Sequence, residues 1–119
     1  MAATKTKRTI IAAATSNAAG ATTSGTEVNL STAYGAVVTA RITNGATGPT
    51  VGPDVVVYVG SATGEKREFS RQTGPTTNNA VTDFVIDIPP GVMFLNVDVT
   101  GNTGQAVTCE VFAQELTTI

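Results

Sequence analysis

The sequence predicts an all-β domain: an antiparallel β-sandwich or jelly roll of seven to eight strands with an extended N-terminal arm. Apolar and polar residues alternate with a period of two in several short runs, which is the repeat of a half-buried strand. Clusters of Gly, Pro and Asn separate these runs at intervals of about ten residues. No run has the 3.6-residue period of an amphipathic helix, so we expect no helix.

The composition changes along the chain and divides it into two parts. Residues 1–25 are rich in Ala, Thr, Ser and Gly, and we assign them to an N-terminal arm or a first strand. Residues 26–119 contain the alternating runs and form the predicted β-sandwich domain. At 119 residues the chain has the length of one domain.

Two large hydrophobic residues in the arm, Ile10 and Ile11, follow three cations, Lys5, Lys7 and Arg8. A flexible tail has no physical need of such a β-prone pair, so we expect contact with other residues to order the segment. One interpretation is that all five residues dock on a partner, with strand addition burying the isoleucines and the cations steering toward an acidic surface. The alternative is that Ile10 and Ile11 begin the domain's own first strand.

The first strands of the predicted domain are residues 26–30 and 33–43, and the second of these alternates regularly. Residues 54–60 include VVVYV, which is apolar on both faces and therefore predicts an interior or covered strand. Residues 66–71 are mostly charged, with both signs, which is typical of an edge strand protected against aggregation. The inward residues of the second strand are Ala36, Val38, Ala40 and Ile42.

The last three predicted strands, residues 81–88, 92–100 and 105–116, alternate most clearly. The PPG after the first of them forces a turn, because proline fixes φ and lacks an N–H donor. The GNTG after the second predicts a tight hairpin. Outward Phe94 and Phe112 then lie on neighbouring strands, where they pair and form an interface for a partner, unless a second layer such as the arm covers them. The inward residues are Phe84, Ile86, Ile88, Met93, Leu95, Val97, Val99, Val107, Cys109, Val111 and Ala113.

Residue types needed for catalysis or metal binding are scarce. The chain has no His, which removes the commonest general base and metal ligand. Its single cysteine, Cys109, falls on an inward position and is predicted to be a small core residue. Asp83 and Asp87 lie about 13 Å apart along one strand, too far to share a metal ion. We therefore predict no catalytic residue, no cofactor and no metal site, and a structural or binding role rather than an enzyme.

The charge distribution argues against two classes of partner. Charged residues make up 13% of the chain, about half the usual share. Carboxylates outnumber cations outside the arm, so we expect no nucleic acid partner. No apolar run approaches the roughly 20 residues of a membrane helix, and the run at residues 10–14 is too short for a secretory signal, so we expect no membrane association and synthesis in a cytoplasm. Low charge and a strand that is apolar on both faces predict a homo-oligomer, which we take to be a trimer.

Three segments carry a resemblance to a known group of proteins: STAYGA, VVVYVG and FVIDIPPGVMFLNVDVTGNTGQAVTCEVFAQEL. Through them, residues 28–116 resemble the capsid decoration, or cement, proteins of tailed bacteriophages, which are small β-sandwich or jelly-roll domains. The resemblance implies a protein that is made in the host cytoplasm and binds the outer capsid surface of the virion. It would bind where copies of the major capsid protein meet, often as a trimer, and help the shell to resist internal pressure. It implies no catalytic or ligand residue.

Two other functions share the same sequence texture and stay open. Another phage virion β-domain, from the neck, tail or fibre, would assemble into rings without capsids. A carbohydrate or cell-surface adhesion module would need an exposed aromatic platform or a metal site.

Overall fold

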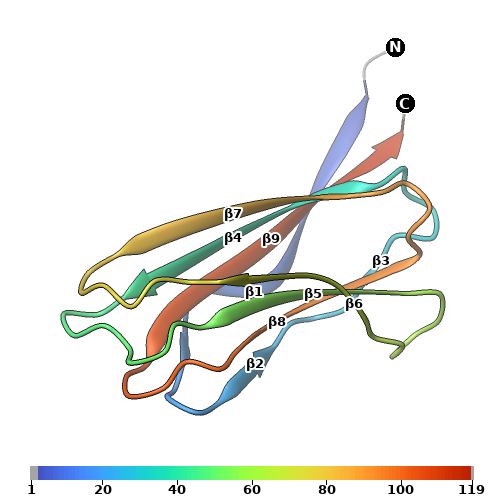
Figure 1. Ribbon diagram of the computed structural model, residues 1–119. Coiled ribbons are helices and arrows are strands. Elements are labelled where there is room, and N and C mark those ends of the chain that lie inside the picture. Colours follow the sequence, from blue (N-terminus) through green and yellow to red (C-terminus); the bar gives the residue numbers. More distant parts are fainter. Residues whose placement is uncertain (1–2, 119) are drawn as a thin grey trace.

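Two antiparallel sheets pack face to face in the computed structural model, which describes residues 3–118 (Figure 1). The four-stranded sheet, called sheet A here, has the order β1-β9-β4-β7. The five-stranded sheet, sheet B, has the order β2-β8-β5-β6, and β3 also pairs with β8. The strands are β1 (Thr4–Asn17), β2 (Thr22–Ser24), β3 (Val28–Asn29), β4 (Ala36–Asn44), β5 (Asp54–Gly60), β6 (Arg67–Thr73), β7 (Val81–Ile88), β8 (Phe94–Thr100) and β9 (Val107–Thr118).

This architecture confirms the predicted all-β sandwich. It has nine strands instead of seven to eight, because both β1 and β2 form within the first 25 residues. Residues 3–118 include no helix, and so none that is long and apolar enough to cross a membrane.

The core consists of the inward side chains of both sheets. Strands β4 and β9 alternate between buried and more exposed residues along almost their whole length, as their sequences predict. Strand β5 is interior to sheet B, and even its outward Val56 is fully buried between its cross-strand neighbours Arg71 and Asp98. The expectation that Met93 points inward is wrong: Met93 is 42% exposed, because β8 begins only at Phe94 and Val92 packs against the core instead.

Strand β1 is the first strand of the domain, paired with β9 from Thr4 to Asn17. Ile10 and Ile11 are 3% and 4% exposed and belong to the core of this domain. Consecutive strand residues normally face opposite ways. Here the register with β9 shifts on both sides of Ile11, and such irregularities allow two neighbouring side chains to point inward.

The GNTG segment does not form the predicted hairpin. β8 belongs to sheet B and β9 to sheet A, so the residues between them cross from one sheet to the other. Asn102 is fully buried at this crossing, where its side-chain amide donates to the main-chain carbonyls of Asn17 and Gln105. The expectation that Phe94 and Phe112 pair across a hairpin is therefore wrong, because the two residues lie in different sheets.

Candidate functional site

The outward side of sheet A presents a surface built from rows of cross-strand neighbours. One row runs Lys7–Gln114–Val37–Asp87, the next runs Thr9–Phe112–Thr39–Val85, and the third joins Glu110, Arg41 and Asp83. Residues two apart on a strand share a face, which is why alternate residues of β1, β9, β4 and β7 meet here. These eleven residues are called the outer face of sheet A below.

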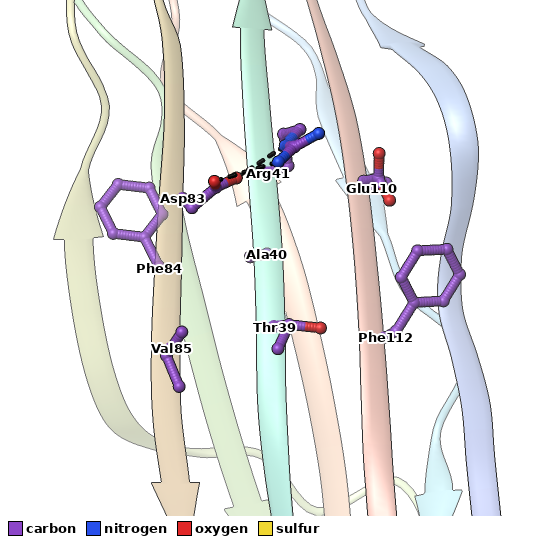
Figure 2. A pocket seen from close by; sticks show the side chains of 8 residues that line it. All are labelled: Thr39, Ala40, Arg41, Asp83, Phe84, Val85, Glu110 and Phe112. Carbon is purple, nitrogen blue, oxygen red and sulfur yellow. Dashed lines mark hydrogen bonds and ion pairs between the residues drawn. The ribbon is translucent and has the colours of Figure 1, made fainter.

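The middle of the outer face of sheet A is partly apolar. Val85 is 68% exposed, Val37 is also exposed, and Phe112 is half-buried. A hollow of about 360 Å³ lies among these strands. In Figure 2, Thr39 lies between Val85 and Phe112. Isolated surface hydrophobics are ordinary, so the reason to consider this face is that three large apolar residues lie on neighbouring strands of it.

The charged groups of this face are arranged by strand. The guanidinium of Arg41 donates from Nε to Asp83 Oδ1 at 2.7 Å and from a terminal nitrogen to Asp83 Oδ2 at 3.1 Å (Figure 2). These hydrogen bonds hold the pKa of Asp83 below its ordinary value and raise the pKa of Arg41. Lys7 lies on the same face but at the opposite edge, on β1, with its Nζ 4.1 Å from the centroid of the Phe112 ring. The face is therefore basic along β1 and acidic along β7.

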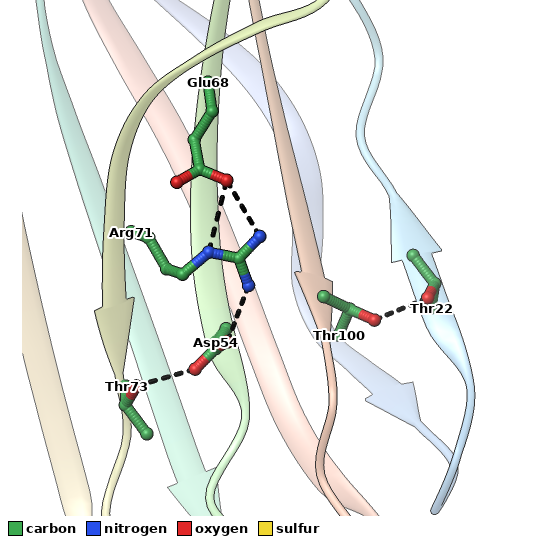
Figure 3. Close-up of polar contacts among 6 residues, drawn as sticks. All are labelled: Thr22, Asp54, Glu68, Arg71, Thr73 and Thr100. Carbon is green, nitrogen blue, oxygen red and sulfur yellow. Dashed lines mark hydrogen bonds and ion pairs between the residues drawn. The ribbon is translucent and has the colours of Figure 1, made fainter.

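The outward side of sheet B is different, because its polar groups bind one another. Figure 3 shows Arg71 donating to Asp54 at 2.7 Å and to Glu68 at 2.8 Å. Asp54 also accepts from the Thr73 hydroxyl at 2.6 Å, and this hydrogen bond is the main reason why the pKa of Asp54 is lowered. Because its ionic groups already pair with one another, this side has fewer unpaired charged groups for a partner to contact than the outer face of sheet A.

The residue types that most often do chemistry are few in this chain, which has no His and one Cys. The Arg41 and Asp83 side chains of the hollow satisfy each other. Residues 3–118 contain no group of three His, Cys, Asp or Glu residues that would hold a metal ion. Cys109 lies in the core, where burial raises the pKa of its thiol to about 11 and keeps it protonated and unreactive.

The structure separates the residues that the sequence singled out as an interface. Lys7 and Phe112 meet on the outer face of sheet A, and Lys5 lies near its end. Arg8 points the other way and donates to the buried carboxylate of Glu115 at 2.7 Å. Phe94 lies on sheet B, beside Gly60 and Asn29. Whether any of them contacts a partner stays a prediction.

Sequence reasoning missed the apolar part of this face. Val37 and Val85 occupy outward positions of β4 and β7, between inward residues on either side. Strict application of the alternation would have found them, because each is a large β-branched residue at a position that should be polar. The contact between Lys7 and Phe112, in contrast, depends on pairing between the two ends of the chain.

Comparison with known proteins shows a widespread fold. No protein-family profile matches the sequence, and no curated protein matches it. A chain of the T13 particle of infectious bursal disease virus (IBDV) superposes with a TM-score of 0.62 at 12% identity, over 94% of this chain but only 31% of that chain. The K3 adhesin domain of Lys-gingipain from Porphyromonas gingivalis gives 0.57 at 10% identity, over 84% of this chain and 72% of that one.

The prophage-derived protein YomS, from SPBc2, is similar over nearly its full length. It gives a TM-score of 0.50 at 20% identity and covers 96% of both chains. This chain thus spans about a third of the IBDV chain but almost all of YomS. At these identities the similarity shows a shared β-sandwich fold alone.

Proposed function

We propose that this chain is a structural protein of a bacteriophage virion, a decoration or cement protein that binds the outer surface of the capsid and stabilises the shell. The observation that carries the proposal is the outer face of sheet A, a partly apolar surface that presents Val37, Val85 and Phe112 on one side of the sandwich. The fold that it shares with an IBDV particle and a prophage-derived protein supports a virion role.

The proposed mechanism is selective binding to the assembled shell. A surface that spans two copies of the major capsid protein exists only in the lattice, so each bound domain stabilises the lattice by mass action and not the free subunits. Val37, Val85 and Phe112 would supply the apolar contact, and Lys7 and Asp87, at opposite ends of one row, would orient the domain.

Cosedimentation with expanded capsids that lack the protein tests this proposal. We expect the wild-type chain to pellet with capsids, and Val85→Asp and Val37→Asp to weaken binding by about tenfold or more. Val51→Asp is the matched control, because Val51 is exposed but lies outside the outer face of sheet A. Binding that is absent, or equally weak for all three variants, would contradict the proposal.

A second candidate is a cell-surface adhesion module, which the similarity to the Lys-gingipain adhesin domain favours. The exposed aromatic residues are Tyr34, in the loop before β4 and beside β9 of sheet A, and Phe69, on β6 of sheet B. They therefore form no shared stacking platform, and we place this candidate second. Binding to immobilised glycans or host cells that Tyr34→Ala abolishes would reverse this order. Ring-shaped assembly without capsids would instead favour a tail or neck protein.

A further inference from the structure

The edge strands of the two sheets differ in how well they are protected against pairing with strands of other molecules. Unpaired backbone groups on an edge strand attract strands of other molecules, and proteins block them with charge, bulges or short strands. β1 carries three register shifts and the cations Lys5 and Lys7. β6 carries Arg67, Glu68 and Arg71, and its pairing with β5 is interrupted by a register shift. β2 and β3, at the remaining edge, have three and two residues.

Strand β7 is less protected than the others, because it has no bulge and its only charges are the carboxylates of Asp83 and Asp87. It pairs with β4 at eight consecutive positions without a register shift, and its sequence VTDFVIDI contains no Lys, Arg, Pro or Gly. It is the last strand of sheet A, with no strand beyond it in the described part of the chain, as Figure 1 shows. Val81 and Val85 are more than half exposed along it. A regular, apolar edge of this kind is suited to strand pairing.

We propose that β7 pairs with β7 of a second copy of this chain, antiparallel about a two-fold axis, so that two copies of sheet A form one eight-stranded sheet. A contact of this kind is isologous and closes on itself with two copies, as in most homodimers, so it predicts a dimer instead of the trimer expected from the sequence. An eight-stranded open sheet lies within the range of known sheets. This inference is independent of the proposed function, because it needs no capsid.

The charges of β7 select one register for this pair. Centring the two-fold axis on Asp83 would place Asp83 opposite its own copy, and centring it on Val85 would place Asp83 opposite Asp87. Like charges directly opposite each other are destabilising. Centring it on Phe84 places Asp83 opposite Val85 and Asp87 opposite Val81, so that no carboxylates face each other. Within each copy, the ion pair with Arg41 also neutralises Asp83.

The same register gives Phe84 a partner. Its side chain is directed toward the core but stays half-buried, because it lies on the edge strand. In Figure 2 its ring lies on the side of β7 away from β4. Centring the axis on Phe84 brings the two rings together, and aromatic pairs across antiparallel strands are among the more stabilising ones.

The proposed β7–β7 interface is small, so the dimer should be weak and must be looked for at high protein concentration. Seven residues of each β7, 81–87, are paired in this register and span about 23 Å, which gives an interface near the lower limit for specific association. We therefore expect a dimer that forms at high micromolar concentration, observed by sedimentation equilibrium. A protein that stays monomeric throughout this range would overturn the proposal.

Disulfide trapping tests the register directly. Val81→Cys and Asp87→Cys are made as separate proteins, mixed and oxidised. In the proposed register residue 81 of one copy lies opposite residue 87 of the other, within disulfide distance. Two copies of the same variant hold their cysteines about 20 Å apart. Cys109 does not interfere, because it is buried.

We expect the mixture to give about tenfold more covalent dimer than either variant alone. Val81→Cys mixed with Val51→Cys is the matched control for random collision, because Val51 is exposed but lies outside β7. A mixture that cross-links no better than this control would overturn the proposal. So would either single variant that cross-links as efficiently as the mixture, because that result requires a different register.

A second pair of variants separates the edge of sheet A from its face. Val85→Lys places a charge on the edge strand, whereas Val37→Lys places the same charge on the same face but on interior strand β4. After circular dichroism has verified folding, we expect Val85→Lys to weaken dimerisation by about tenfold or more and Val37→Lys to leave it nearly unchanged. Equal weakening would mean that the copies meet face to face. A different result would be a wild-type chain that stays monomeric and a Val85→Lys variant that alone loses capsid binding; β7 would then pair with a strand of the capsid protein. Each of these two results would overturn the proposal.

Discussion

We expect the substitution Asn102→Ala to lower the free energy of unfolding, because the Asn102 side chain joins the segments where the chain crosses between the two sheets. Its side chain is fully buried. Its Nδ2 donates to the carbonyl oxygens of Asn17 at 3.2 Å and of Gln105 at 2.9 Å. Its Oδ1 accepts from the Asn17 side-chain amide. The end of β1 and the start of β9 are thereby tied to the end of β8, although no ladder of strand pairing joins β8 to β9.

Replacing Asn102 with alanine removes these three hydrogen bonds and leaves a small cavity. A buried hydrogen bond contributes about 1 kcal/mol net, so we expect the free energy of unfolding to fall by about 2–4 kcal/mol. Asn17 keeps part of its bonding, because its amide also donates to the Ala21 carbonyl at 3.1 Å. Urea unfolding followed by far-UV circular dichroism measures the loss.

Asn78→Ala is the matched control, because Asn78 is exposed and its side-chain oxygen accepts only from Gly48 N–H. We expect it to cost less than about 1 kcal/mol. A double-mutant cycle with Asn17→Ala should show coupling of about 1 kcal/mol between the two asparagines. If Asn102→Ala costs no more than Asn78→Ala, or the cycle is additive, the crossing is held by other contacts and the reasoning is refuted.

Three further predictions follow from the burial and charges of the chain. Ile11→Ala should lower the free energy of unfolding by about 2–5 kcal/mol in the same urea assay, whereas a loose arm would show almost no change. The folded chain should lose stability in acid, because four carboxylates have a folded pKa below their unfolded value: their stabilisation is complete above about pH 5.5 and is lost as the pH falls through the unfolded and then the folded values, so a melting temperature independent of pH below 5 would contradict it. Cys109 should react with a thiol reagent at pH 8 only as fast as the domain unfolds, because its pKa of about 11 reflects burial, and rapid labelling of the folded chain would show that it is accessible. The four carboxylates are Asp54, Glu65, Glu68 and Asp83.

The alternating pattern of the sequence was enough to predict the strands and their faces, because side-chain direction in a strand depends on local geometry. β4 and β9 bury the alternate residues that the pattern assigns to the core. The run VVVYV predicted a covered strand, and β5 is interior to sheet B. The mixed charges of residues 66–71 predicted an edge strand, and β6 lies at the edge.

The assignment of strands to sheets was decided only by the tertiary structure. A short connection rich in Gly and Asn suits a hairpin and a crossing between sheets equally well, and the buried bonds of Asn102 distinguish them. Ile10 and Ile11 break the alternation, and only the register shifts against β9 explain how both are buried. The contacts of the residues predicted to form an interface were also beyond local pattern: Lys7 meets Phe112, and Arg8 meets Glu115, across nearly the whole length of the chain. Local patterns specify which way a side chain points, but its neighbours depend on the free energy of long-range pairing, which no short window of sequence contains.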